Sequence, residues 1–163
     1  MSSTSLTPVE EYLSRTEKPL CEYRDGVLHA KPMPTKLHGL VQFTLVLLLR
    51  RLGLDAVPEV TLRLSPTRFL IPDVIAAKSI ADPYPVEPVE LCCEILSPED
   101  RLGAMLAKCE EYHAWGVPYC WVIDPVKQSA WEYHAGAEPV RVESVLNAGQ
   151  TTIQLAELFA KDN

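Results

Sequence analysis

The chain of 163 residues has little glycine and none of the loop motifs that mark the commonest phosphate-binding and hydrolytic enzymes. Its seven glycines are scattered, so no glycine-rich phosphate loop is present. It also contains neither the G-x-S-x-G motif of serine hydrolases nor the H-E-x-x-H motif of zinc peptidases. Any catalytic chemistry must therefore come from residues that are far apart in the sequence.

Long hydrophobic runs are also missing. The longest continuous run, residues 45–49, ends at two arginines and falls well short of the ~18 residues that cross a bilayer. The first residues, Met-Ser-Ser-Thr-Ser, do not combine a basic start with an apolar stretch. We therefore expect no signal peptide and no membrane association.

Disulfide and zinc motifs are absent in the same way. The five cysteines form no C-x-x-C pair, and several lie in apolar runs typical of strands. We expect reduced core cysteines and a cytoplasmic protein, because reducing compartments keep thiols free.

Positive charge is in short supply, since the net charge is -7. Coating nucleic acid by bulk electrostatics requires clustered Lys and Arg, so this class of protein is disfavoured. A nuclease is not excluded, because a bound divalent metal reverses the charge of an acidic site. The candidate phosphate contacts are scattered: Lys31, Lys36, Arg63, Arg68 and Arg101.

The predicted elements favour one α/β (α+β) domain over residues 1–163, with a mixed sheet flanked by helices and a C-terminal β-meander. Asp25-Gly26 between two short apolar runs predicts a β-hairpin. The expected strands are residues 20–23, 27–30, 56–64, 69–76, 89–96, 119–123, 130–134, 140–146 and 151–155.

Three helices are expected in addition to these strands. Thr7-Pro8 and Ser97-Pro98 each place a capping hydroxyl before a proline, which predicts helices to about residues 15 and 115. Residues 36–52 predict a third helix, apolar nearly all round. Such a helix is buried in the core or at a subunit contact, so we expect a homodimer.

Two carboxylates interrupt the apolar strands. Alternation places Asp73 on the same face as Ile75, and Glu94 on the same face as Cys92. Burying an ionised carboxylate without a partner costs several kcal/mol, so both acids need compensation. A hard divalent cation, Mg²⁺ or Mn²⁺, would supply it to both. Separate salt bridges, or wet strand ends, are the alternative.

Lys108 is predicted to reach Glu94. It lies about 16 Å beyond Ser97 at ~1.5 Å per helical residue, whereas Glu94 lies about 10 Å before Ser97 along the strand. Helical side chains lean toward the N-terminus, so the two groups meet if the helix folds back over its strand. The ammonium would then orient or help deprotonate an attacking water. A solvated surface lysine is the alternative.

Two further residues are candidates. His38 stands near the start of the apolar helix, where it is either a capping or core-edge residue or the rim of a metal site. Glu22 lies in the first hairpin strand, where it is either an exposed acid or part of the same site.

The order of these residues is similar to that of a known family. Glu22 before Asp25-Gly26, His38 at a helix start, Pro72-Asp73, Glu94 before Ser97-Pro98, Lys108 four residues before Tyr112, Gly116-Val117-Pro118-Tyr119, and Trp121 before Asp124-Pro125 form an ordered set. This set resembles the Uma-type (Uma two) restriction endonuclease family of the PD-(D/E)xK nuclease superfamily, from about residue 7 to residue 125.

The resemblance implies a restriction-endonuclease-like core and cleavage of DNA phosphodiester bonds with Mg²⁺ or Mn²⁺. It implies that Asp73, Glu94 and the backbone carbonyl of Ile95 bind the metal. Lys108 would be the catalytic lysine, with Glu22 and His38 completing the site. The superfamily's usual Glu-x-Lys would place lysine at position 96, where this chain has leucine. The family resembled here moves that lysine onto the following helix.

Two other functions remain open at this point. A catalytically silent domain would keep the nuclease fold as a binding or regulatory module, and the acidic net charge favours it. An unrelated metal-dependent hydrolase would act on a small phosphoester. Metal-dependent DNA cleavage distinguishes the endonuclease from both.

Overall fold

The structure is a computed structural model that describes residues 5–160, so both ends of the expected 1–163 domain lie outside the described residues. Within this range no helix is long and apolar enough to cross a membrane.

The largest element is a six-stranded mixed sheet, the main sheet, with the order β10-β9-β8-β7-β6-β3. Its strands are β3 (Asp55–Pro58), β6 (Val74–Ala77), β7 (Leu91–Ile95), β8 (Tyr119–Asp124), β9 (Ser129–His134) and β10 (Val140–Val142). The β7–β8 pair is parallel and the others are antiparallel. This confirms the expected mixed sheet.

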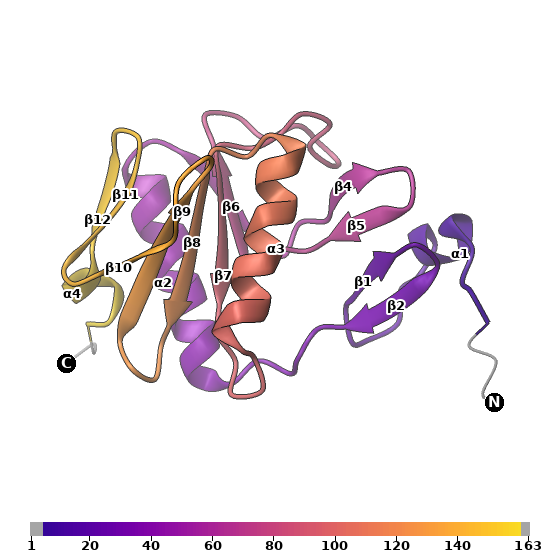
Figure 1. Ribbon diagram of the computed structural model, residues 1–163, viewed down its shortest axis with the longest axis horizontal. Helices are drawn as coiled ribbons and strands as arrows, with labels where there is room; N and C mark the ends of the chain where they lie inside the picture. The colour runs from indigo at the N-terminus through magenta and orange to yellow at the C-terminus, as the bar shows by residue number, and fades with distance from the viewer. Residues whose placement is uncertain (1–4, 161–163) are drawn as a thin grey trace.

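Two helices cover opposite faces of the main sheet, α2 (Lys36–Arg51) behind it and α3 (Leu102–Trp115) in front of it in Figure 1. Neighbouring strand residues divide between them, as the two-residue period of a strand requires. Cys93 packs in the same cluster as Leu45 of α2, whereas Cys92 packs with Cys109 of α3. All five cysteines are free and buried, as predicted.

A second sheet projects from the main one, and we call it the arm sheet (Figure 1). It has the order β2-β1-β5-β4. Its strands are β1 (Cys21–Arg24), β2 (Val27–Ala30), β4 (Leu62–Ser65) and β5 (Arg68–Leu70), and the short helix α1 (Val9–Leu13) packs against it. The predicted hairpin at Asp25-Gly26 is confirmed, and Gly26 has a φ of 92°.

Two predicted strands are each divided between the sheets. The expected strand 69–76 is β5 in the arm sheet and β6 in the main sheet, because Pro72 lies between them and cannot donate to a ladder. The expected strand 56–64 divides into β3 and β4 after Pro58, where Glu59 has a φ of 58°. The arm sheet is therefore built from chain that runs into the main sheet.

The predicted caps of two helices are wrong. The N-cap of α1 is Pro8 rather than Thr7, and α3 begins at Leu102 instead of just after Ser97. The Asp100 carboxylate accepts from the Ser97 backbone N–H at 2.8 Å, and this closes a turn before the helix starts. Among the helices of the described residues, α2 alone has a hydroxyl cap, because the Thr35 side chain accepts from the His38 backbone N–H.

Helix α3 ends at Trp115, as predicted, and Gly116 follows as its C-cap. The φ of 122° at Gly116 is unfavourable for residues with a side chain. A Cβ atom at this position would lie 2.9 Å from Pro88, in the loop before β7. The end of α3 is therefore in close contact with the start of the strand that carries Glu94.

The C-terminal part contains more elements than predicted. The expected strand 140–146 divides into β10 and β11 (Val145–Ala148). Strand β11 pairs with β12 (Thr151–Gln154) in a separate hairpin, followed by the unpredicted short helix α4 (Leu155–Leu158). These elements pack with α2 on the back of the main sheet, remote from the residues described next.

Candidate active site

The two strand carboxylates lie side by side. Val74 of β6 pairs with Cys93 of β7. Asp73 lies directly before β6 and not, as expected, within a strand. Continuing the antiparallel register by one residue places it opposite Glu94. Both are almost fully buried and line one cleft of about 1060 Å³ between the main sheet and the arm sheet. Their position matches the face alternation predicted from the sequence.

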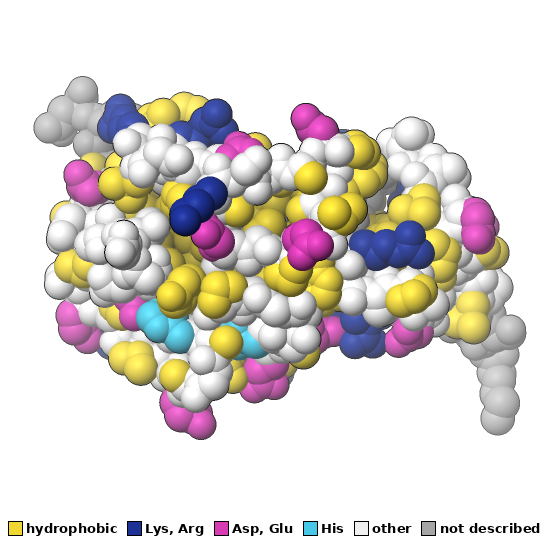
Figure 2. Space-filling model, turned by 90° about the horizontal axis from the view of Figure 1, so that it is seen from above, with side chains coloured by type: hydrophobic (Ala, Val, Ile, Leu, Met, Phe, Trp, Pro, Cys, Tyr) yellow, Lys and Arg dark blue, Asp and Glu magenta, His cyan; other side chains and the backbone are white. Residues whose placement is uncertain are grey.

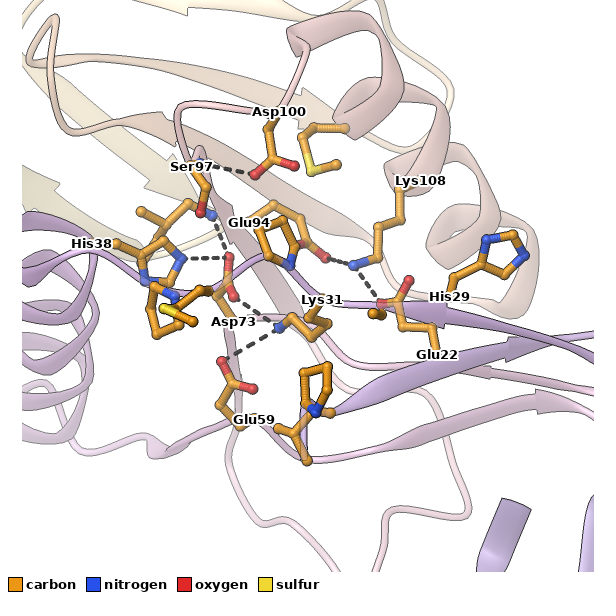
Figure 3. Close-up of a pocket in the computed structure, with 18 of the residues that line it drawn as sticks. Glu22, His29, Lys31, His38, Glu59, Asp73, Glu94, Ser97, Asp100 and Lys108 are labelled. Carbon is orange, nitrogen blue, oxygen red and sulfur yellow. Dashed lines mark hydrogen bonds and ion pairs between the residues drawn. The ribbon is translucent and has the colours of Figure 1, made fainter. Parts of the chain in front are cut away.

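Glu94 is bound by α3. The Lys108 ammonium lies 2.8 Å from Glu94 Oε1, and the Tyr112 hydroxyl donates to the same oxygen at 2.5 Å. Lys108 also lies 2.6 Å from Glu22 Oε1 of the arm sheet. Glu22 in turn accepts from the Ile71 backbone N–H at 2.8 Å. We call Glu94, Lys108, Glu22 and Tyr112 the Glu94 half of the site, and Figure 3 shows the first three of them.

Asp73 is bound from three directions. Its Oδ2 atom accepts from the Ile95 backbone N–H at 2.7 Å and lies 3.4 Å from His38 Nε2. Its Oδ1 atom lies 2.9 Å from the Lys31 ammonium, which lies 3.4 Å from Glu59. Asp73, His38, Lys31 and Glu59 form the Asp73 half of the site (Figure 3).

Gln42 joins the Asp73 half through helix α2. Its amide donates to the Asp73 backbone carbonyl at 2.8 Å and to Glu59 at 3.1 Å. His38 and Gln42 stand one turn apart, so both face the cleft. The Thr35 cap fixes the start of the helix that carries them.

The pKa values of the two carboxylates shift in opposite directions. Burial alone would raise the pKa of Asp73, but its hydrogen bond with His38 and the charge of Lys31 lower that pKa overall. Burial raises the pKa of Glu94 to about 7, although Lys108 opposes the increase. For Lys108, burial disfavours the ammonium, but Glu94 and Glu22 outweigh it and raise the pKa.

The structure decides between several of the alternatives for single residues. Asp73 and Glu94 each form a salt bridge with a lysine. Both also line one cleft, so separate salt bridges are compatible with a shared site. Lys108 is buried, so it is not a solvated surface lysine, and Glu22 is not an exposed acid. His38 stands within the capped first turn of α2 and also contacts Asp73.

The donor set fits a divalent cation. Carboxylate and carbonyl oxygens are the ligands that Mg²⁺ and Mn²⁺ prefer, and Mg²⁺ commonly takes only one or two protein carboxylates. Within residues 5–160, no group of three or more His, Cys, Asp or Glu side chains is arranged to hold a metal. A cation here would thus rely on Asp73, Glu94 and a backbone carbonyl, with its remaining ligands from water or substrate.

A comparison with protein families identifies the family of this chain. A family model described as "Uma2: Putative restriction endonuclease" matches residues 9–162, nearly the whole chain. The chain belongs to the Uma2 family. The match extends past residue 125, where the resemblance in the sequence fades, and includes the C-terminal hairpin.

A solved structure has the same fold as this Uma2 protein. It is a putative nuclease belonging to DUF820 from Anabaena variabilis, with a TM-score of 0.78 and 20% sequence identity. The alignment covers 93% of this chain and 98% of that one. No curated protein matches the chain. The restriction-endonuclease-like fold expected from the sequence is confirmed.

Sequence reasoning missed four residues of this Uma2 site. Tyr112 was identifiable by its spacing of four from Lys108, which puts both on one helix face. Lys31 was considered only as a phosphate contact, and Glu59 and Gln42 carry no local signal. Their contacts depend on how the arm sheet and α2 approach β6, which single-strand patterns do not encode.

Two other candidate phosphate contacts have structural roles. The Arg68 guanidinium lies 2.8 Å from both Asp25 and Glu111, which ties the arm sheet to α3. Arg63 lies over the Phe69 ring at 5.0 Å. On the face shown in Figure 2, Lys and Arg side chains are separated by acidic and apolar ones and do not form a continuous band.

Proposed function

We propose that this Uma2 protein is a divalent-metal-dependent endonuclease that hydrolyses DNA phosphodiester bonds. The observation that carries the proposal is the shared position of Asp73, Glu94 and Lys108. They come from three separate parts of the chain and meet in one cleft of about 1060 Å³. The family assignment supports the same chemistry.

Asp73, Glu94 and the Ile95 carbonyl would hold Mg²⁺ or Mn²⁺. When bound, such an ion activates water and neutralises charge on the phosphoryl oxygens. The protein contributes the position of these ligands. The Ile95 N–H and His38 orient Asp73, while Tyr112 orients Glu94.

Lys108 would act as a fixed positive charge in this reaction. Its raised pKa keeps the ammonium protonated, so it donates hydrogen bonds and does not accept a proton. Glu22 and Glu94 hold it from opposite sides of the cleft. It is therefore suited to orient the attacking water and to stabilise negative charge in the transition state.

Plasmid DNA and an RNA of similar length, each incubated with Mg²⁺, Mn²⁺ or EDTA, test the proposal. We expect DNA cleavage that EDTA and the Asp73→Ala and Lys108→Ala substitutions abolish. Lys78→Ala, at an exposed position after β6, is the matched control and should cleave like the wild type. Retained cleavage in both site variants would refute this site assignment, and cleavage of RNA alone would refute the DNA substrate.

The protein would act as a homodimer. Four large apolar side chains of α2 are exposed on the face that does not pack on the main sheet: Leu37, Leu40, Phe43 and Leu47. A second copy would cover this stripe, and two-fold symmetry suits the cutting of two DNA strands. Light scattering at micromolar concentration should give a dimer mass that Phe43→Glu reduces to the monomer mass. A monomeric wild type would refute the dimer.

A catalytically silent binding module remains the second candidate. It is favoured by the fact that lysines already pair with both carboxylates. Calorimetry separates it from the nuclease, because a silent module should give no Mn²⁺ binding. Binding that is lost in Glu94→Ala would exclude the silent module.

A further inference from the structure

Lys31 has a position that the nuclease chemistry described above does not use. It follows the end of β2 in the arm sheet, and its side chain crosses the cleft to the main sheet (Figure 3). The ammonium lies 2.9 Å from Asp73 Oδ1 and donates to the Ile71 carbonyl, also at 2.9 Å. Its side chain is 14% exposed. Lys31 thus binds the carboxylate that a metal would need.

The two lysines in the cleft are outnumbered by the acids that they contact. Lys31 lies within ion-pair distance of Asp73 and Glu59, and Lys108 within ion-pair distance of Glu94 and Glu22. Each lysine therefore serves two carboxylates, and a cation would add positive charge to this group of acids.

Such an ion would compete with Lys31. A cation on Asp73 would lie within a few ångströms of the ammonium, and like charges at that distance repel strongly in a buried site. Lys108 is held by two carboxylates and is only 7% exposed, so it is the more firmly fixed of the two lysines. Lys31 extends from the arm sheet on a long flexible side chain, and Lys18 and Arg24 line the same cleft.

We infer that Lys31 is an internal counter-ion of Asp73 that a divalent cation displaces, and that the displaced ammonium binds a substrate phosphate in the same cleft. The inference rests on the proposed function, because it requires a cation at Asp73. Lys31 thus contacts the Asp73 carboxylate when no cation is bound, and a substrate phosphate when the cation is bound.

Calorimetric titration with Mn²⁺ tests the first contact. Lys31→Met removes the competing charge and keeps the length of the side chain, so we expect Mn²⁺ to bind about tenfold more tightly than to the wild type. Lys31→Arg keeps the charge and Lys78→Met changes an exposed lysine after β6, so both should bind like the wild type. Equal or weaker binding by Lys31→Met would overturn the inference.

Thermal unfolding separates this effect from a loss of structure. Without metal, Lys31→Met should melt at a lower temperature than the wild type, because Asp73 loses its cation. Mn²⁺ should then raise the melting temperature of Lys31→Met more than that of the wild type. A merely structural lysine would give the first result without the second. Lys31→Gln serves as the second variant if the methionine variant does not fold.

The titrations also separate this inference from the proposed function. Asp73→Asn should abolish the Mn²⁺ signal in both the wild type and the Lys31→Met background. If neither the wild type nor Lys31→Met binds Mn²⁺, both proposals fail. If the wild type binds through Asp73 and Lys31→Met binds equally well, only the role of Lys31 fails.

Binding of a fluorescent DNA duplex in Ca²⁺ tests the second contact. Loss of one phosphate contact should weaken binding by Lys31→Met and make the dependence of log K on log salt shallower by about one. Lys78→Met, at an exposed position after β6, should retain the slope of the wild type. An unchanged slope in Lys31→Met would overturn the phosphate contact.

Discussion

The two halves of the site hold a buried carboxylate in different ways. Both surround a buried carboxylate with a lysine, yet the pKa of Asp73 is lowered and the pKa of Glu94 is raised to about 7. Asp73 has a backbone N–H and a histidine in addition to its lysine. Glu94 has a phenol and a lysine that it shares with Glu22.

Because both acids are almost fully buried, the number and kind of their donors account for the difference between their pKa values. Among the described residues, the hydrogen-bond and ion-pair partners of Glu94 all contact Oε1. The partners of Asp73 are divided between its two oxygens. An added cation should therefore stabilise the ionised form of Glu94 more than that of Asp73.

The largest expected effect is the removal of Lys108. Lys108→Met leaves Glu22 and Glu94 buried together without a cation, which should lower the free energy of unfolding by about 3–5 kcal/mol. Lys31→Met should cost about 2 kcal/mol or less, because Asp73 keeps its other donors. Urea unfolding at pH 8 in EDTA measures both. A greater loss in Lys31→Met would contradict the comparison.

The pH dependence of stability should have opposite signs in the two halves. Glu94 ionises near 4.5 when exposed and near 7 in the fold, so the folded protein retains a proton that the unfolded chain loses. Stability should fall by about 3 kcal/mol as pH rises through this window. Glu94→Gln should remove that decrease, as measured by urea unfolding in EDTA.

Asp73 should act at lower pH. Its pKa in the fold lies below the ordinary 3.8, so its ionised form stabilises the protein above that value. This stability is lost as pH falls through the lowered pKa. Asp73→Asn should flatten the acid side of the curve and leave the window between 4.5 and 7 unchanged. A common pH profile for the two variants would show that the carboxylates titrate together.

Tyr112→Phe should have a smaller effect. It removes one hydrogen bond to buried Glu94, which should cost about 1–3 kcal/mol. Tyr133 donates to Glu110 at the surface, so Tyr133→Phe is the matched control and should cost less than about 0.5 kcal/mol. Equal losses would show that the phenol does not support Glu94.

Thr35→Ala should give the smallest change, about 1 kcal/mol. Its hydroxyl accepts from the His38 N–H at 3.1 Å and fixes the first turn of α2 in the Asp73 half. Ser97→Ala is the contrast, because Ser97 caps no helix and should change stability by less than about 0.5 kcal/mol. Thermal unfolding of both variants distinguishes a working cap from a mere capping sequence.

Local patterns were sufficient for much of this fold. Alternation gave the face of its own expected strand on which each of Asp73 and Glu94 lies, and strand–helix geometry brought Lys108 to Glu94 despite the wrong helix start. Asp100 accepts from the Ser97 backbone N–H as in a capping box, yet the chain forms only a turn there and the helix begins at Leu102. His38 was a candidate from the sequence, but Lys31 and Glu59 were beyond reach, because they meet Asp73 only through the approach of two sheets.

The close contact between Gly116 and Pro88 has a consequence for the evolution of this site. Lys108 lies eight residues before Gly116, on a rigid helix, so the end of α3 sets how far the lysine extends along β7. Any larger residue at 116 would push against the Pro88 ring, 2.9 Å from where its Cβ would stand. Mutations in this remote loop could thus adjust the alignment of lysine and carboxylate without altering either one.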